Sequence, residues 1–230
     1  MNKRPIILVI IVLGAAGSTM IISRRKLQPQ PSISISNVTP LSTTIEHPAS
    51  LAPTITPVAT VAPPTASPVL IAPIAEFHQR ITKKFFGTFV TPARSPVQPE
   101  RFTGYHTGVD VEYGDVSTDV PVVAVADGTV VQSGWVSGYG GLLVIKAMIN
   151  QETVFILYGH VRMSSLPAPG ISVHQGKQIG VLGTGGTHET DGERHHLHFA
   201  LYKGKSLDIR GYVPRLTDLA TWIDPLSLYL

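Results

Sequence analysis

A proline-rich stretch without a single glycine divides this chain of 230 residues, and that stretch decides which part can fold. Residues 27–75 contain ten prolines, 13 serines or threonines and no glycine, and Glu46 is their only charged residue. Proline removes backbone donors and breaks helices, so a packed core is not expected there. We predict a Pro/Ser/Thr-rich disordered spacer over 27–75; a stiff polyproline rod is the alternative and differs only in stiffness.

Glycine is concentrated after the Pro-rich stretch, since 19 of the 21 glycines lie between Gly87 and Gly211. Turn signals such as Asp127-Gly128 and Pro169-Gly170 separate short runs rich in β-branched and aromatic residues. These runs cover residues 120–126, 128–135, 142–148, 153–158, 178–182 and 196–202. Such spacing is typical of an antiparallel β sandwich or barrel-like domain. We therefore expect residues 76–230 to form one mainly β domain, with helical periodicity only near 76–86 and 215–223.

The N-terminal residues 1–26 have the pattern of a signal anchor or signal peptide. Lys3 and Arg4 precede an apolar run from Ile6 to Ile22, and three further basic residues follow it. As a helix this run would span about 26 Å, slightly less than the ~30 Å hydrocarbon core of a membrane. We expect a transmembrane segment and an extracytoplasmic domain of the cell envelope, membrane-anchored, or secreted if the signal is cleaved.

Charge and cysteine content exclude several functions. The formal net charge of +3 comes from the N-terminus, since residues from Glu76 onward include 13 basic and 14 acidic side chains. The domain itself therefore has no excess of positive charge, and no nucleic-acid partner is expected. The absence of cysteine excludes disulfides, thiol nucleophiles and cysteine-ligated zinc. Any metal must be held by His, Asp or Glu.

Histidines fall in three short segments that can share one site. In an extended segment alternate residues share a face, so His106 and Asp110 point one way, with Gly108 between them leaving room for an ion. His196 and His198 likewise share a face, while Leu197 and Phe199 point to the core. His160 closes the run at 153–158. Imidazole and carboxylate groups together are ligands typical of zinc, and three protein ligands with one open position are typical of a catalytic site.

These segments, in this order, resemble the lysostaphin/LytM-type zinc metallopeptidases, which are peptidoglycan endopeptidases with the duplicated-hybrid-motif β fold. The likeness rests on residues 121–130, 134–145, 157–160, 170–183 and 196–199, and it extends over roughly residues 80–230. It implies one Zn²⁺ per chain, held by His106, Asp110 and His198. It also implies that His160 and His196 are catalytic histidines that do not bind the metal.

Two departures from the family pattern lie near this proposed site. Residues 185–194 form a longer and more highly charged segment before the His-x-His pair, and Ala200 replaces the usual glutamate. Both put the substrate preference of relatives in doubt for this chain. Residues 90–101, with three prolines, are a candidate cover for the cleft. The bond that is cut and the oligomeric state stay open.

Three other functions fit this sequence less well than that of a peptidoglycan endopeptidase. A non-catalytic cell-wall-binding or amidase-activating module of the same fold typically lacks metal ligands, whereas all five key positions are present here. A zinc hydrolase of other peptides is less compatible with the N-terminal anchor and spacer. A carbohydrate-binding domain is expected to offer an aromatic platform, yet Trp135 and Trp222 are the only tryptophans.

Overall fold

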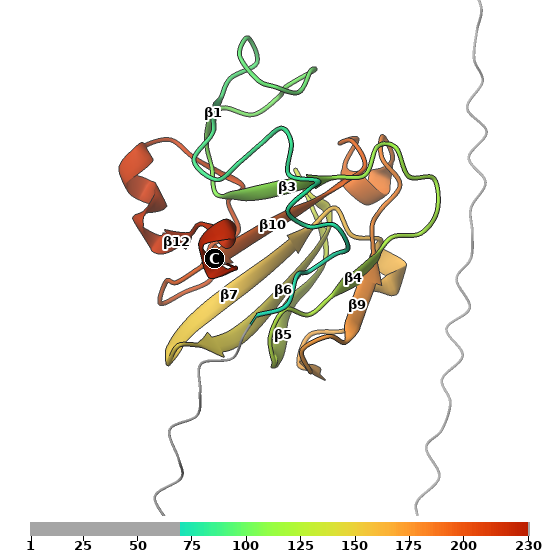
Figure 1. Ribbon diagram of the computed structural model, residues 1–230, viewed down its shortest axis with the longest axis vertical. Helices are drawn as coiled ribbons and strands as arrows, with labels where there is room; N and C mark the ends of the chain where they lie inside the picture. Colours follow the sequence, from blue (N-terminus) through green and yellow to red (C-terminus); the bar gives the residue numbers. More distant parts are fainter. Residues whose placement is uncertain (1–69, 230) are drawn as a thin grey trace, which may run out of the picture. The chain divides into compact units, whose positions relative to one another are not determined.

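Antiparallel strands dominate the computed structural model, which describes residues 70–229 (Figure 1). Its main sheet has the strand order β12-β10-β7-β6-β5-β8, and β3 also pairs with β10. These strands are β3 (Gly108–Glu112), β5 (Gly128–Val136), β6 (Gly140–Ile149), β7 (Glu152–Gly159), β8 (Ser172–Val173), β10 (His196–Tyr202) and β12 (Trp222–Ile223). The expectation of a mainly β, antiparallel domain is confirmed. The terminal strands β12 and β8 do not pair with each other, so the described part of this sheet is open rather than a closed barrel.

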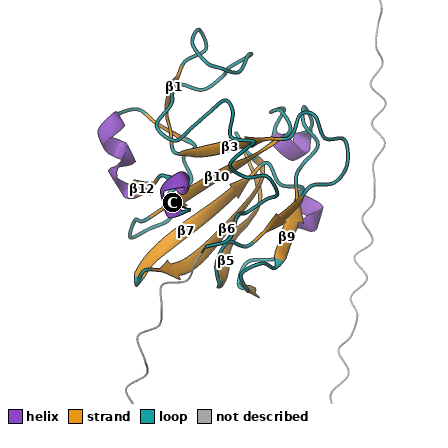
Figure 2. Ribbon diagram, viewed as in Figure 1, coloured by secondary structure: helices purple, strands orange, loops and turns teal. Residues whose placement is uncertain are grey.

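Two smaller sheets and four short helices complete the described chain. One sheet contains β1 (Phe89–Val90), β2 (Gly104–His106) and β11 (Tyr212–Val213), and the other pairs β4 (Pro121–Val123) with β9 (Gln178–Val181). All four helices are 3-10 turns (Figure 2): η1 (Met163–Ser165), η2 (His188–Thr190), η3 (Leu216–Thr221) and η4 (Pro225–Leu228). No helix between residues 70 and 229 has the length and apolarity needed to cross a membrane.

The central strands of the main sheet, β6, β7 and β10, are buried on both faces. On β6, Leu143 and Ile145 belong to one hydrophobic cluster, while Leu142 and Val144 belong to a second. The first cluster also contains side chains of β4, β9 and the segment that leads into the domain, and the second contains side chains of β11 and η3. This double burial explains why β6 is a nearly continuous apolar run without the alternation of a half-exposed strand.

Helical periodicity at residues 76–86 is misleading, because this segment folds as turns and extended chain. The carbonyl oxygens of Arg80 and Lys84 accept hydrogen bonds from the backbone N–H groups of Glu112 (2.9 Å) and Asp110 (3.0 Å). The segment therefore satisfies the free edge of β3 instead of its own helical bonds. At residues 215–223 the helical pattern is realised only as η3, followed directly by β12.

The last residues of the Pro-rich stretch pack against the domain. Leu70 and Ile74 are buried in the first hydrophobic cluster. The carbonyl oxygen of Pro73 accepts a hydrogen bond from the backbone N–H of Val123, and that of Ala75 accepts one from the hydroxyl of Tyr113. The packed chain thus includes residues 70–75. The predicted signal segment 1–26 and residues 27–69 of the predicted spacer lie outside the described residues.

Candidate metal centre and catalytic pocket

Strand β10 positions the site because it lies between β3 and β7 (Figure 1). Its register places His198 opposite Asp110 of β3 on one side and opposite Gly159 of β7 on the other. Leu197 points into the first hydrophobic cluster, as the alternation predicts, so the two histidines of β10 face the opposite side. A single strand thereby brings together side chains that are up to about ninety residues apart.

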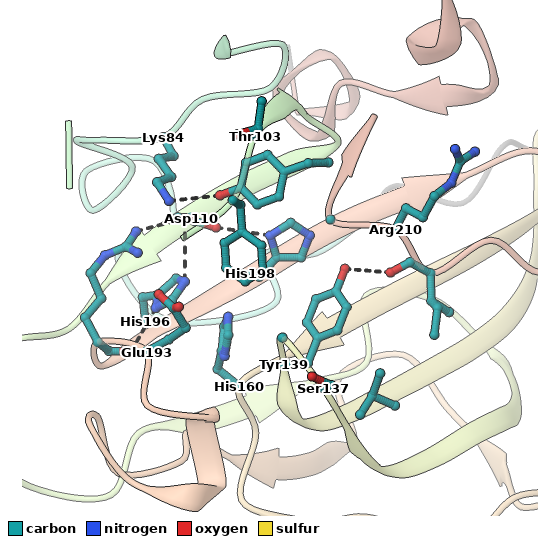
Figure 3. A pocket seen from close by; sticks show the side chains of 17 residues that line it. Lys84, Thr103, Asp110, Ser137, Tyr139, His160, Glu193, His196, His198 and Arg210 are labelled. Carbon is teal, nitrogen blue, oxygen red and sulfur yellow. Dashed lines mark hydrogen bonds and ion pairs between the residues drawn. The ribbon is translucent and has the colours of Figure 1, made fainter. Parts of the chain in front are cut away.

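Three predicted ligand residues, His106, Asp110 and His198, meet in one buried cluster. Figure 3 shows two of them, Asp110 and His198, at the wall of a pocket. His106 Nε2 lies 3.0 Å from His198 Nδ1 and 3.2 Å from Asp110 Oδ1. His198 Nδ1 lies 3.1 Å from the same carboxylate oxygen. Four ligands at tetrahedral angles and about 2.0–2.1 Å from zinc are about 3.3 Å apart. The three atoms therefore form a triangle of nearly the size that one zinc ion requires.

The histidine tautomers also fit a metal. His106 Nδ1 lies 3.2 Å from the carbonyl oxygen of Phe85, so this nitrogen carries the proton and Nε2 presents its lone pair to the cluster. In the neutral tautomer with the lone pair on Nδ1, His198 carries its proton on Nε2, a buried atom that has no partner among the described residues. The donor set, two imidazoles and one carboxylate, suits zinc without identifying the ion.

The second oxygen of Asp110 is held by an arginine that the sequence did not single out. Arg194 Nη2 donates to Asp110 Oδ2 at 2.8 Å, which leaves Oδ1 as the oxygen that faces the two ligand histidines. Burial alone would raise the pKa of Asp110, but this pKa lies well below its ordinary value, and the charged hydrogen bond from Arg194 favours the ionised form. The carboxylate is therefore ionised, as a metal ligand must be.

His160 and His196 stand beside this cluster with their ring centroids 4.3 Å apart. His196 Nδ1 lies 2.9 Å from the carbonyl oxygen of Arg194, which assigns the proton to Nδ1 and leaves Nε2 as an acceptor 3.5 Å from Asp110 Oδ2. His160 Nδ1 is buried without a partner in the described chain. Its φ of 62° lies in the left-handed region, an unusual conformation for a side-chain-bearing residue at the end of a strand.

Burial is the main cause of the acid–base behaviour of these two rings. It lowers the pKa of His160 to about 3. Burial likewise lowers the pKa of His196 well below its ordinary value. Both rings are therefore neutral near pH 7, and each has one ring nitrogen with a free lone pair.

A pocket of about 400 Å³ opens onto both the cluster and the two histidines (Figure 3). Its walls contain several residues that sequence reasoning missed: Lys84, Phe102, Tyr139, Arg194 and Tyr212. They come from the segment before β1, the approach to β2, the β5–β6 turn, the segment before β10, and β11. Nothing in their local sequence marks them as neighbours. The one available signal was the high charge of residues 185–194.

The most unusual of these residues is Lys84, whose side chain is only 2% exposed. Its ammonium lies 2.6 Å from Glu100 Oε2, which is equally buried, and donates a hydrogen bond to the hydroxyl of Tyr212 at 2.9 Å. Burial alone would raise the pKa of Glu100, but hydrogen bonds from Lys84, the Phe102 N–H and Ser95 leave it below its ordinary value. This ion pair connects the turn before β1 to the approach to β2.

Other expectations about the surroundings of the site have mixed outcomes. Glu193 and Arg194 of the charged segment line the pocket, as expected, but Ala200 is fully buried and does not line it. Residues 90–101 are likewise absent from the pocket walls, so they do not cover this pocket in the structure. The space beside Gly108 is not open to an ion, because a Cβ there would lie 2.3 Å from the carbonyl oxygen of Phe199.

Comparison with known proteins gives one family. Residues 104–209 match Peptidase family M23. Among curated proteins nothing matches.

Several solved structures are similar to the chain. Csd3 from Helicobacter pylori shares 22% identity, with 70% of this chain and 35% of that chain covered and a TM-score of 0.44. LytU shares 24% identity, with 64% and 81% covered and a TM-score of 0.41. The SpoIIQ–SpoIIIAH pore forming complex shares 18% identity, with 71% and 92% covered and a TM-score of 0.46. The chain thus spans about a third of the length of the Csd3 structure.

Proposed function

The chain belongs to peptidase family M23 through residues 104–209, and on that premise we propose that it is a zinc-dependent endopeptidase that hydrolyses peptide cross-links of bacterial peptidoglycan. The observation that carries this proposal is the buried triangle formed by His106 Nε2, Asp110 Oδ1 and His198 Nδ1, with two further neutral histidines beside it.

We assign His106, Asp110 and His198 to the metal, since their ligand atoms converge and their tautomers leave lone pairs free. When bound, zinc supplies a Lewis acid that polarises a carbonyl and makes water more acidic. Arg194 fixes the second oxygen of Asp110 and thereby the orientation of this ligand.

Peptide hydrolysis also needs a group that takes a proton from water and returns one to the leaving amine. His196 suits this role, because its Nδ1–H is fixed on the carbonyl oxygen of Arg194 and its Nε2 faces the cluster as an acceptor. His160 lies against His196 on the same side and has an unpartnered ring nitrogen. We propose that the two rings share proton transfer and stabilisation of the tetrahedral intermediate.

Digestion of purified peptidoglycan, followed by mass analysis of the fragments, tests the proposal. The zinc-loaded chain is expected to release fragments with one peptide bond hydrolysed, to stop when a chelator is added, and to recover when zinc is returned. If the zinc-loaded chain binds the wall but releases no fragments, it is a non-catalytic module of the same fold. Cleavage that persists after complete removal of metal would contradict the zinc assignment.

We also propose that the domain works outside the cytoplasm, held by the N-terminal segment or secreted after its cleavage. The proposal is supported by the basic and apolar pattern of residues 1–26 and by the class of substrate. A reporter enzyme fused after Leu230 should be active only when the fusion is exported. A reporter that is active only in the cytosol would overturn this topology.

A further inference from the structure

Arg194 presents a guanidinium group to the pocket with part of its hydrogen-bonding capacity unused. Its Nε lies 3.0 Å from both carboxylate oxygens of Glu112, and its Nη2 donates to Glu112 Oε1 at 2.6 Å and to Asp110 Oδ2 at 2.8 Å. A guanidinium group has five N–H donors, and the two on Nη1 make no hydrogen bond within residues 70–229. Arg194 also lines the pocket.

This group is fixed before any ligand arrives. Its side chain is 18% exposed, and the contacts to Glu112 and Asp110 hold the guanidinium plane from one edge. Nη1 is bonded to the same carbon as Nη2, so it lies within a few ångströms of the carboxylate that faces the metal cluster. A donor held in place loses little conformational entropy when it binds.

The charges around Arg194 favour an anion once the site is loaded. Glu112 is shared with Lys83, whose ammonium lies 3.3 Å from it, and Asp110 is the proposed metal ligand. Arg194 and Lys83 thus balance the two negative charges of Glu112 and Asp110 before a metal is added, and Glu193, which also lines the pocket, is paired with Arg101. Adding a divalent cation leaves this wall of the pocket with net positive charge, and Arg–carboxylate contacts are among the strongest charge-assisted hydrogen bonds.

We propose that Arg194 Nη1 forms a carboxylate-binding subsite of this pocket. The substrate is then a peptide with a free carboxylate, terminal or on a side chain, close to the bond that is cut. This inference rests on the proposed peptidase function and specifies its substrate. It assigns a role to the charged segment 185–194, whose last residue is Arg194.

The test uses two synthetic cross-linked peptides that differ only in whether the carboxylate next to the scissile bond is free or amidated. Wild type is expected to prefer the free acid by roughly 10- to 100-fold in kcat/KM, from one charge-assisted contact. Arg194→Gln should remove this preference mainly through a rise in KM for the free acid, while Arg194→Lys retains part of it. The matched control is Arg215→Gln, which removes an exposed arginine paired only with Asp218.

Calorimetric binding of the two cleavage products, free acid and amide, gives a readout that does not depend on turnover, and zinc content is measured for every variant. If Arg194→Gln lowers cleavage of both peptides equally, Arg194 only supports Asp110 and the subsite is overturned. If wild type cleaves neither peptide yet binds the free acid more tightly, and Arg194→Gln abolishes that difference, the subsite stands and the peptidase proposal fails. Equal binding of acid and amide by wild type would overturn the subsite alone.

Discussion

At the scale of single residues, the histidines divide into those whose ring nitrogen belongs to the ligand triangle and those that stand beside it. We predict that His198→Ala loses the metal, because one corner of the triangle disappears. His160→Ala should keep zinc and lose roughly 10²- to 10⁴-fold in kcat, the usual contribution of a proton-transferring group. Metal analysis of both purified variants, together with peptidoglycan hydrolysis, checks this. Equal zinc content in the two variants would show that the ligand assignment is wrong.

Lys84 and Glu100 form an ion pair in which both charges are buried, so the two residues depend on each other for stability. Removing one partner leaves the other charge uncompensated, so Lys84→Met or Glu100→Gln should each cost about 3–5 kcal/mol in the free energy of unfolding. The double variant, with no isolated charge, should be more stable than either single variant. Denaturant unfolding of the three variants measures this, and simple additivity of the two losses would exclude a coupled pair.

The buried pair also makes the free energy of unfolding depend on pH, in a direction set by the lowered pKa of Glu100. The pKa of Glu100 is lower in the folded chain than in the unfolded chain, so its contribution to stability is present above its unfolded pKa, about 4.3. That contribution is lost as the pH falls through the lower folded value. The stability difference between wild type and Glu100→Gln should therefore be largest near neutral pH and shrink below about pH 4. A difference that grows on acidification would contradict the lowered pKa.

At the scale of elements, the pairing of β3 with β10 decides whether the ligands meet. Gly108 of β3 lies opposite Ala200, and a Cβ on it would come within 2.3 Å of the carbonyl oxygen of Phe199 and 2.8 Å of the Ala200 Cβ. Gly108→Ala should push the two strands apart, cost about 1–3 kcal/mol of stability, and weaken zinc binding. Thermal unfolding and metal affinity measure the two effects. Gly114→Ala, where a Cβ would meet nothing within 4 Å, is the matched control.

The elements that could be predicted from the sequence are those whose pattern follows from local chemistry. The His-x-His alternation placed His196 and His198 on one face correctly, because side-chain direction in a strand depends only on sequence spacing. The prediction that Gly108 leaves room for an ion was wrong. The missing side chain instead allows β10 to lie close to β3. Ala200 is small for the same reason, since it faces Gly108 across the strand pair.

Elements whose form depends on distant partners could not be predicted. Residues 76–86 have a helical pattern, yet their carbonyl groups bond to β3, an interaction that no local window contains. Lys84, Arg194 and Tyr212 reach the pocket from segments up to 128 residues apart, as the Lys84–Tyr212 hydrogen bond shows. The absence of cysteine and the spacing of the histidines predicted a metal site held by His and Asp. The residues that form the walls of the pocket depend on tertiary packing and could not be predicted in this way.

At the scale of the whole molecule, metal binding and folding are linked. The three ligand atoms come from β2, β3 and β10 and converge only in the folded chain, so zinc should bind the native state far better than the unfolded state. Free zinc at about 1,000 times its Kd adds about 4 kcal/mol of stability, which raises Tm by roughly 8–16 °C in a domain of this size. Scanning calorimetry with zinc and with a chelator measures the shift. His198→Ala should show almost none, and an equal shift in that variant would place the zinc elsewhere.

The folded unit begins within the Pro-rich stretch, because residues 70–75 pack against the domain. Leu70 and Ile74 are buried in the same cluster as β5, β6 and β7, and three carbonyl groups of residues 70–75 accept hydrogen bonds from the domain. A chain that begins at Glu76 should therefore lose about 2–5 kcal/mol of stability compared with one that begins at Leu70, chiefly from lost apolar burial. Urea unfolding of the two chains measures the difference, and Ile74→Ala in the full chain separates side-chain burial from truncation. If both chains unfold at the same urea concentration, residues 70–75 add no stability and the spacer extends to residue 75.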